Sequence, residues 1–388
     1  MTEVDLVLVG GGGAAHCLLH ALGVAGPRAL LRGGRRGAGL DGLRVAVVDP
    51  VRHTGNDRTW CFWDRGRSPV EDAVTRRWPA LRVVGPDGTP HTLDLHGRSY
   101  ALVRSADLYA LARDRAARLD VTWHDDTVLD VRDGPDRATV TTPSGELRAR
   151  WVFDSRPGPP RRAATTALLQ HFRGWWLSGV DVEESAATLM DFAVPQPDDG
   201  LAFGYVLPVS ARRALVEYTV FSRHRLPPEA YDVVRQRFPG ARVDSVEDGA
   251  IPMTDARYPR RTGRRVFRLG TGGGATRPAT GYTFRAMLRQ AASIAESLAA
   301  QRVPLPPRPY PRRHLGYDAV LLHALDRGLV DGRRLLTDLL VTTPYALGFL
   351  DGTTTLRQEL SVLTATPRLA MARATAGVLR ARLAAAYR

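Results

Sequence analysis

A short apolar run that ends in four consecutive glycines most constrains how this chain of 388 residues can fold. Asp5-Leu-Val-Leu-Val-Gly10 is typical of a buried parallel strand, and an apolar stretch long enough for a helix follows the glycines. Between them stands Gly10-x-Gly12-x-x-Ala15, the spacing of a dinucleotide-binding turn. Gly10 would permit the tight turn, Gly12 the close approach of a pyrophosphate, and Ala15 close packing of helix on strand.

Three further segments support a nucleotide site. Leu43-Arg-Val-Ala-Val-Val-Asp49 predicts a second buried strand whose terminal carboxylate would accept hydrogen bonds from ribose hydroxyls. Trp151-Val-Phe-Asp154 is a strand followed by an acid, and Phe267-Arg-Leu-Gly270 leads into a second glycine-rich turn. A second turn so late in the chain favours FAD over a nicotinamide nucleotide, since FAD needs an additional backbone cradle. We therefore add Asp154, Gly270, Gly272 and Gly281 to the candidate cofactor-binding residues Gly10, Gly12, Ala15 and Asp49.

Along the rest of the chain, the hydrophobic pattern changes to that of strands and then, from residue 281, to that of helices. Residues 23–42 look like a Gly- and Arg-rich loop, and 102–118 carry helical spacing. Short strands, in which apolar and polar residues alternate, are expected around 121–123, 128–131, 138–141 and 147–153. The stretch 165–250 is mostly strand. From 281 onward apolar residues recur at three- and four-residue spacing, which predicts helices over 281–301, 318–343 and 351–386.

Charge and composition exclude several classes of protein. The formal net charge is +14, but all the basic residues are arginines, spread along the chain in short pairs without a basic helix or an RNA-binding motif. We therefore expect no nucleic-acid partner, whereas a positive surface suits anionic lipid headgroups. His53, His124, His171 and His314 lack metal-ligand spacing, so no metal is expected. Two cysteines, no long apolar run and no signal-peptide pattern predict a cytoplasmic protein.

Several ordered motifs resemble the lycopene cyclase family of bacteria and plants, over roughly residues 5–360. Leu189-Met-Asp191-Phe192 is similar to its Met-Asp-Phe motif, and Leu215-Val-Glu217-Tyr218-Thr219 to its Phe-Leu-Glu-Glu-Thr motif, with Tyr218 in place of the second Glu. The other matching segments are Thr59-Trp-Cys-Phe-Trp-Asp64, Gly249-Ala-Ile-Pro-Met253-Thr254, Thr280-Gly-Tyr282-Thr-Phe284 and Gly348-Phe-Leu-Asp-Gly352.

The resemblance implies an α/β fold: an FAD-binding Rossmann-like domain of the flavoprotein monooxygenase and reductase type, an inserted antiparallel β-sheet substrate domain and C-terminal helices. We expect the FAD-binding domain to comprise residues 1–70, 100–165 and 260–300. The substrate domain would comprise 71–99 and 166–259, and the helical region 301–388.

The resemblance also implies the activity of a lycopene β-cyclase, which closes the linear ends of lycopene into β-ionone rings without net oxidation. The acid would be Glu217, with Asp191 as second choice, since a carboxyl kept protonated by a dry pocket can protonate an alkene. FAD would act in its reduced form, with NAD(P)H as reductant. Aromatic faces can stabilise the carbocation, and the candidate substrate-binding residues are Trp60, Phe62, Trp63, Trp175, Tyr205, Tyr218, Tyr282 and Phe284.

Three alternatives remain open at this point. A flavin-dependent monooxygenase or prenyl reductase would share the fold but consume NAD(P)H. A cyclase for another polyprenyl or terpenoid chain would differ only in the shape of its pocket. A carotenoid- or nucleic-acid-binding protein without activity would lack flavin. Because lycopene partitions into the bilayer, the favoured interpretation also predicts peripheral contact with a membrane surface.

Overall fold

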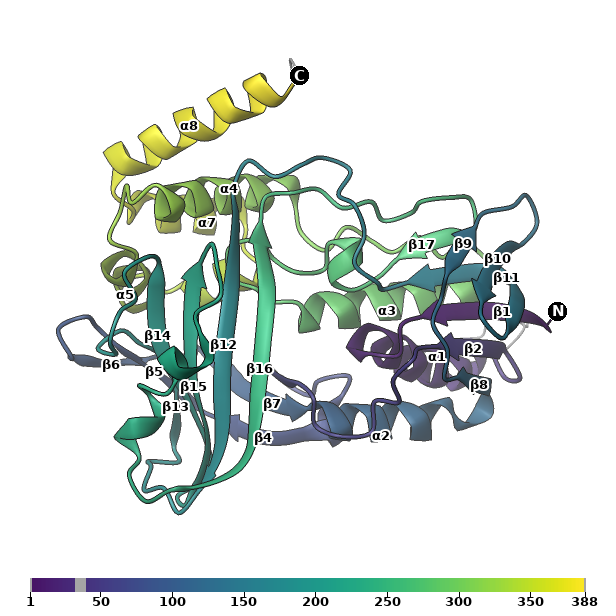
Figure 1. Cartoon of the computed structure of the whole chain (residues 1–388), viewed down its shortest axis with the longest axis horizontal. Helices are drawn as coiled ribbons and strands as arrows, with labels where there is room; N and C mark the ends of the chain where they lie inside the picture. Colours follow the sequence, from purple (N-terminus) through teal and green to yellow (C-terminus); the bar gives the residue numbers. More distant parts are fainter. Residues whose placement is uncertain (1, 32–39, 387–388) are drawn as a thin grey trace.

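The computed structural model describes residues 2–31 and 40–386. Its first sheet is the nucleotide-type sheet, with strand order β8-β2-β1-β11-β10-β9 and β17 paired to β11 (Figure 1). Strands β1, β2, β8, β11 and β17 run parallel, whereas β9 and β10 are antiparallel additions. The bounds are β1 Thr2–Val9, β2 Arg44–Val48, β8 Asp120–His124, β9 Asp130–Arg132, β10 Ala138–Thr142, β11 Gly145–Asp154 and β17 Val266–Arg268.

Helices cover one face of this sheet. Leu6 and Leu8 point toward α1 (Gly13–Leu31), α2 (Ser105–Arg115) and α3 (Phe284–Ala299), while Val7 and Val9 belong to a second cluster on the other face. The alternation follows from the two-residue period of a strand. The expected sequence of strand, glycine turn, helix and strand is therefore present.

The expected loop over 23–42 is wrong for its first part. Helix α1 continues to Leu31, and the remainder of the segment up to residue 39 lies outside the described residues. Gly23 lies within this helix, and a Cβ atom at this position would overlap the carbonyl group of Arg115. The glycine thus serves close packing against the end of α2 rather than a turn.

Two more sheets form the other half of the molecule. The three-stranded sheet has the order β3-β7-β4, with β3 Thr59–Asp64, β4 Val74–Trp78 and β7 Ser99–Arg104. The large sheet has the order β16-β12-β15-β14-β13-β5-β6, and it is antiparallel except where β13 runs parallel to β5. Its bounds are β5 Ala80–Val84, β6 Pro90–Leu93, β12 Ala167–Ser178, β13 Ala186–Asp191, β14 Leu201–Ser210, β15 Arg213–Ser222 and β16 Arg242–Thr254.

The C-terminal helices are shorter than the periodicity predicts. The second and third expected helices are each interrupted, giving α4 Arg312–Asp326, α5 Gly332–Thr342, α6 Ala346–Asp351, α7 Leu356–Thr364 and α8 Arg368–Ala386. Gly328 and Gly352 lie just beyond α4 and α6 with positive φ angles, which end a helix at little cost. Figure 1 shows α8 lying across α4 at the outside of the molecule.

Candidate functional site

The glycine turn after β1 has the geometry that the sequence predicts. Gly10 has φ +92°, and its N–H donates to the carbonyl oxygen of Val48 at 2.9 Å. A Cβ atom at Gly10 would overlap the hydroxyl of Ser155, whereas one at Gly12 would meet nothing within 4 Å. The turn is therefore closed on the side of β11 and open at Gly12, in front of the first turn of α1. Backbone N–H groups at such a helix N-terminus favour an anion such as a pyrophosphate.

Asp49 stands at the end of β2, beside this turn. Its Oδ2 accepts a hydrogen bond from the N–H of Gly11 at 2.6 Å, and its Oδ1 accepts one from the N–H of Val51 at 2.8 Å. Ala15 is buried, as expected for a small residue that lets α1 pack on the sheet. The turn between β1 and α1 thus brings together four of the predicted cofactor-binding residues: Gly10, Gly12, Ala15 and Asp49. The open turn, the helix N-terminus and the carboxylate fit the phosphate and ribose of a dinucleotide.

The second glycine turn meets the first. Gly270 has φ +56°, and a Cβ atom there would lie 3.2 Å from the Cβ of Ala14. Gly272 is enclosed by backbone, since a Cβ atom would overlap the carbonyl oxygen of Arg156. Gly281 has φ +69° and lies against the side chain of Gln170 in the large sheet. Gly270 therefore borders the nucleotide turn, whereas the other two glycines serve close packing.

Asp154 is already occupied by partners within the chain. Its Oδ1 accepts from the backbone N–H of Arg156 at 3.0 Å, and its Oδ2 accepts from Arg268 at 2.7 Å. The side chain of Arg156 also binds both oxygens. These contacts tie β11 to β17 and make Asp154 a structural anchor of the nucleotide sheet.

Strand β3 lies between the nucleotide turn and the large sheet. Trp60 and Phe62 point toward the helices: the Trp60 ring stacks on Phe284 at 5.0 Å, and a Cβ atom at Gly13 would lie 2.7 Å from it. Cys61 and Trp63 point the other way and pack with the inner face of the large sheet. The predicted aromatic residues are therefore divided, with Trp60, Phe62 and Phe284 beside the nucleotide turn.

The inner face of the large sheet carries a row of polar residues. The register pairs Tyr205 of β14 with Glu217 of β15, Glu217 with Gly174 of β12, and Gly174 with Glu247 of β16. Directly paired residues of antiparallel strands point to the same face. Glu217 is buried, and its Oε1 accepts a hydrogen bond from the hydroxyl of Thr219 at 2.5 Å. Burial raises the pKa of Glu217 to about 8, and the charge of Glu247 acts in the same direction.

Aromatic and sulfhydryl groups surround this carboxyl group. The hydroxyls of Tyr100 and Tyr205 are 2.7 Å apart, and both contact the thiol of Cys61, whose pKa is raised by burial to about 12. The Trp63 ring packs on Tyr100 with centroids 5.8 Å apart and meets the edge of Tyr282 at 5.2 Å. Burial also raises the pKa of Tyr100, Tyr205 and Tyr282 well above the usual tyrosine value. The groups packed around Glu217 are thus mostly aromatic and neutral.

Three predicted residues lie on the opposite face of the large sheet. Trp175 and Tyr218 belong to an outer cluster with Tyr231 and Val234, and the Tyr218 hydroxyl donates to the carbonyl oxygen of Pro195 at 2.6 Å. Asp191 is paired with Gly204, on the same outer face, and its Oδ2 accepts from Arg237 at 2.7 Å. These side chains are therefore not brought to Glu217, because neighbouring residues of a strand point in opposite directions.

The sequence analysis missed two residues of this cluster, Tyr100 and Glu247. Glu247 is buried, and its Oε1 accepts from the Thr59 hydroxyl at 2.6 Å and from the indole N–H of Trp176 at 2.9 Å. Glu247 lies two residues before the recognised Gly249 motif, on a strand whose register the sequence does not reveal. The one feature of the sequence that could have indicated Glu247 is a carboxylate two residues before that motif.

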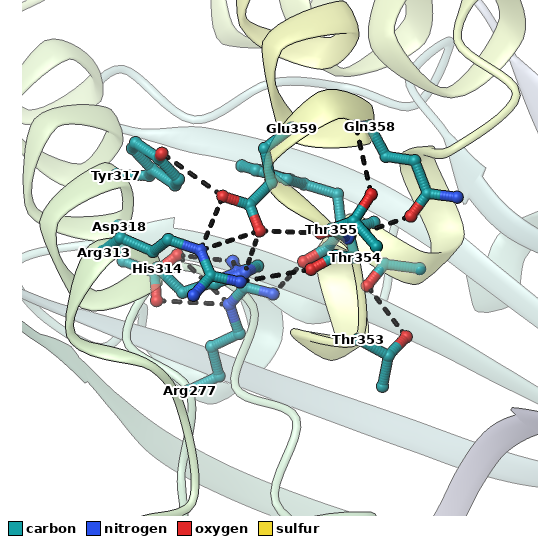
Figure 2. A network of polar contacts seen from close by, with 12 residues as sticks. Arg277, Arg313, His314, Tyr317, Asp318, Thr353, Thr354, Thr355, Gln358 and Glu359 are labelled. Carbon is teal, nitrogen blue, oxygen red and sulfur yellow. Dashed lines mark hydrogen bonds and ion pairs between the residues drawn. The ribbon is translucent and has the colours of Figure 1, made fainter.

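A buried ion network holds the loop that carries Tyr282. The guanidinium of Arg277 binds Asp318 of α4 at 3.0 Å and the carbonyl oxygen of Phe349, and it approaches His314 (Figure 2). His314 is in turn bonded to Glu359 of α7 at 2.9 Å. The backbone N–H of Arg277 donates to the carbonyl oxygen of Tyr282 at 2.9 Å, which closes the loop. The C-terminal helices therefore position Tyr282 against Trp63 of β3.

A cleft of about 400 Å³ opens at one end of the same inner face. Leu168, Leu201 and Phe221 line it from the sheet, and the turn between α4 and α5 closes it. Phe221 lies on the same face of β15 as Glu217, four residues away, which is about 13 Å along a strand. The Phe203 and Phe221 rings meet edge to face at 5.4 Å along this path.

Within residues 2–31 and 40–386, no helix combines the length and apolarity that a membrane crossing needs. In the same ranges, no three His, Cys, Asp or Glu residues are grouped as ligands for a metal ion.

Solved structures share this fold. A geranylgeranyl bacteriochlorophyll reductase-like protein from Thermoplasma acidophilum superimposes with a TM-score of 0.62 at 16% identity, covering 94% of this chain and 96% of that one. The p-nitrophenol 4-monooxygenase PnpA from Pseudomonas putida has a TM-score of 0.53 at 16% identity over 97% of each chain. The halogenase PltM has a TM-score of 0.55 at 12% identity, covering 99% of this chain and 96% of that one. The expected monooxygenase- and reductase-like flavoprotein fold is confirmed.

Sequence comparison identifies the family. A curated relative, "Lycopene beta-cyclase" from Paracoccus sp. (strain N81106 / MBIC 01143), is 29% identical over an alignment of 265 residues that covers 64% of this chain. The match spans 61% of that relative's length. The family model described as "Lycopene cyclase protein" matches residues 5–376. The chain therefore belongs to the lycopene cyclase family.

Proposed function

We propose that this protein is a lycopene β-cyclase that uses Glu217 as its acid. The observation that carries the proposal is the state of this carboxyl group. Glu217 is buried among Cys61, Tyr205 and neighbouring aromatic rings, and burial raises its pKa to about 8. A carboxyl group in such surroundings carries its proton at neutral pH and can deliver it to a substrate that offers no hydrogen-bonding group.

The proposed reaction adds one proton and removes one. Glu217 protonates a terminal alkene of the linear carotenoid, which leaves a tertiary carbocation. A neighbouring double bond attacks this cation and closes the ring, and loss of a ring proton gives the β-ionone end group. Tyr205 lies directly across from Glu217, and we assign stabilisation of the cation to its ring together with those of Trp63 and Tyr282, which contact each other edge to face. Asp191 has no part in this step, because Arg237 holds it on the outer face.

The nucleotide turn would hold FAD. The fit of the open glycine turn, the α1 N-terminus and Asp49 supports this assignment, and Gly270 borders the same turn. When bound in its reduced form, with NAD(P)H as reductant, the flavin would supply negative charge close to the developing cation. Trp60 and Phe62 point from β3 toward this turn and pack with Phe284 of α3, so we assign all three to the cofactor side of the site.

The polyene chain would lie along the inner face of the large sheet. From Glu217, the face continues past Phe203 and Phe221 to the 400 Å³ cleft beside α4 and α5. Phe203 and Phe221 are packed in the protein core, and Arg223 and Asp326 line the cleft beside its apolar residues, so the polyene would have to part these side chains to reach the acid. This path would accommodate the whole length of the carotenoid and not only the end group at Glu217.

The proposal includes peripheral contact with a membrane surface, through α7 and α8. Leu369, Leu379 and Leu383 are more than half exposed and lie on one side of α8, and Leu356 and Leu360 are likewise exposed on α7. Arg368, Arg373 and Arg380 are exposed on α8, and no Asp or Glu occurs after Glu359. Exposed leucines flanked by arginines suit the boundary between acyl chains and anionic headgroups.

Pigment analysis of lycopene-accumulating bacteria tests the proposal. Cells that express the wild-type chain are expected to contain γ- or β-carotene, and cells that express Glu217→Gln are expected to retain lycopene. Glu229→Gln is the matched control, because Glu229 is exposed and lies outside the site. Unchanged lycopene with a folded, flavin-containing wild-type protein would overturn the assignment of substrate.

A prenyl reductase is the second candidate, since the Thermoplasma protein named reductase-like has a TM-score of 0.62 with this chain. A reductase consumes one NAD(P)H for each double bond reduced, whereas a cyclase needs the reductant only in catalytic amounts. Measuring NADPH oxidised per molecule of product separates the two. A ratio near one would favour the reductase.

A further inference from the structure

Glu217 and Glu247 face each other across a strand that has no side chain between them. Gly174 of β12 pairs with Glu217 on one side and with Glu247 on the other. Two strand spacings place the two backbone positions about 10 Å apart, with both side chains on the inner face. A Cβ atom at Gly174 would lie 3.1 Å from Cδ1 of Leu215 and 3.5 Å from the Cβ and Cγ atoms of Glu217, so the Leu215 and Glu217 side chains pack directly over the glycine.

The two carboxyl groups have different hydrogen-bond partners. Glu247 Oε1 accepts two hydrogen bonds, from the Thr59 hydroxyl and from the Trp176 indole N–H. An indole N–H can only donate, so it fixes this oxygen of Glu247 as an acceptor. Glu217 receives one hydrogen bond, from Thr219 on its own strand. Two donors stabilise an ionised carboxylate more than one does, and the negative charge therefore belongs on Glu247.

The other groups that meet this face leave the pair isolated. Tyr205 approaches from β14, Cys61 from β3, Tyr100 from β7 and Tyr282 from the loop before α3, and burial raises the pKa of each. The cation nearest to the row is Arg104 of β7, which lies over the Trp176 ring at 4.6 Å. Among the described residues, no salt bridge joins an arginine to Glu217 or Glu247 (residues 2–31 and 40–386).

We infer that Glu247 is a positioning residue for the acid: its negative charge, held by Thr59 and Trp176 across Gly174, keeps the proton on Glu217. Two like charges at this distance in a dry site repel each other, so the pair holds one proton between them. The proton rests on Glu217, the member with fewer donors. This inference deepens the proposed function and rests on it, because it names a charge that adds to the effect of burial on the acid.

The test follows the Glu217 carboxyl group directly, without substrate. Infrared difference spectra of the full-length protein, recorded between pH 5 and pH 10, report the C=O band of a protonated carboxyl, and Glu217→Gln identifies the band that belongs to this residue. In Glu247→Gln we expect the midpoint of that band to move to lower pH by about one unit or more. Glu247→Asp keeps the charge and should restore most of the wild-type midpoint, whereas the exposed Glu229→Gln should leave it unchanged.

Activity at a series of pH values separates this inference from the proposed function. The alkaline limb of the cyclisation rate should shift to lower pH in Glu247→Gln by the same amount as the infrared midpoint. If the wild-type protein does not cyclise lycopene but the infrared midpoint still moves in Glu247→Gln, the assignment of lycopene as substrate is wrong. The coupling between Glu217 and Glu247 would then still stand. An unmoved midpoint in a folded Glu247→Gln protein would overturn the inference. If the amide variant does not fold, Glu247→Met removes the charge with a side chain of similar length and is judged by the same midpoint.

Discussion

Tyr205 lies directly across from Glu217 in the large sheet, and its hydroxyl is bonded to that of Tyr100 at 2.7 Å. This contact joins the large sheet to the three-stranded sheet at the acid itself. Because neither tyrosine ionises in the ordinary pH range, the two hydroxyls close the pocket without adding charge. Glu217 is therefore buried by hydroxyl groups that are neutral over the whole pH range in which it is protonated.

Catalysis should fail on the alkaline side. The pKa of Glu217 is about 8, and the proposed acid acts only in its protonated form. The rate of cyclisation is thus expected to be constant below about pH 7 and to fall about tenfold for each pH unit above the pKa. Measuring product formation from lycopene in detergent or vesicles checks this. A rate that rises between pH 8 and pH 10 would contradict an acid role for Glu217.

Stability should depend on pH through the same group. The folded pKa of Glu217 is raised to about 8 from 4.5, so the folded protein binds a proton that the unfolded chain releases between these values. This contribution to the free energy of unfolding is complete below about pH 4.5 and is lost as the pH rises toward 8, with a magnitude on the order of a few kcal/mol. Chemical denaturation at several pH values should show the loss in the wild type. Glu217→Gln should flatten that part of the curve, and an identical pH dependence in both proteins would count against it.

The nucleotide turn should not tolerate a side chain at Gly10. Gly10→Ala combines a φ angle of +92° with a clash against Ser155, and we expect it to lower the flavin content of the purified protein at least tenfold. Gly88→Ala is a matched control, because Gly88 has φ +85° but nothing within 4 Å of its Cβ position. Flavin absorbance per mole of protein is the measurement. Equal flavin content in the two variants would show that the turn does not hold the cofactor.

The buried pair of Arg277 and Asp318 should be strongly coupled. Both side chains are almost fully buried, so Arg277→Met leaves an unpaired buried carboxylate. We expect it to lower the free energy of unfolding by about 3–5 kcal/mol. The double variant Arg277→Met/Asp318→Leu should recover a large part of that loss, since it removes both charges. Urea unfolding of both variants tests this, and an additive double variant would argue against the pair.

The leucines of α8 should determine lipid binding. Replacing Leu369, Leu379 and Leu383 by Gln is expected to reduce co-sedimentation with vesicles that contain anionic lipid at least tenfold, because each Leu loses about 1.5–3 kcal/mol of apolar burial. Leu129→Gln is the matched control, since Leu129 is 62% exposed but lies beside β9 of the nucleotide sheet. If the triple variant sediments with vesicles as the wild type does, α8 is not the membrane-binding surface.

The sequence predicted the parts of the site that are local. The glycine turn, Ala15 and Asp49 lie within one β-α-β unit, where spacing along the chain determines position in space. Glu217 could be recognised from its motif, and strand alternation alone implies that Tyr218, the next residue, points away from it. Glu247 was missed because its proximity to Glu217 depends on the register of β12 with two neighbours, and 30 residues separate the two acids along the chain. The helix ends after 281 were misplaced because single glycines with positive φ, rather than the apolar period, terminate α4 and α6.

Strand β3 has one further consequence. Its even residues Trp60 and Phe62 face the nucleotide turn, while its odd residues Cys61 and Trp63 face the acid. One strand thus forms a wall on both sides through alternate residues, and a substitution at one position alters the contacts on one side. A single inserted residue, by contrast, would exchange the two walls at once.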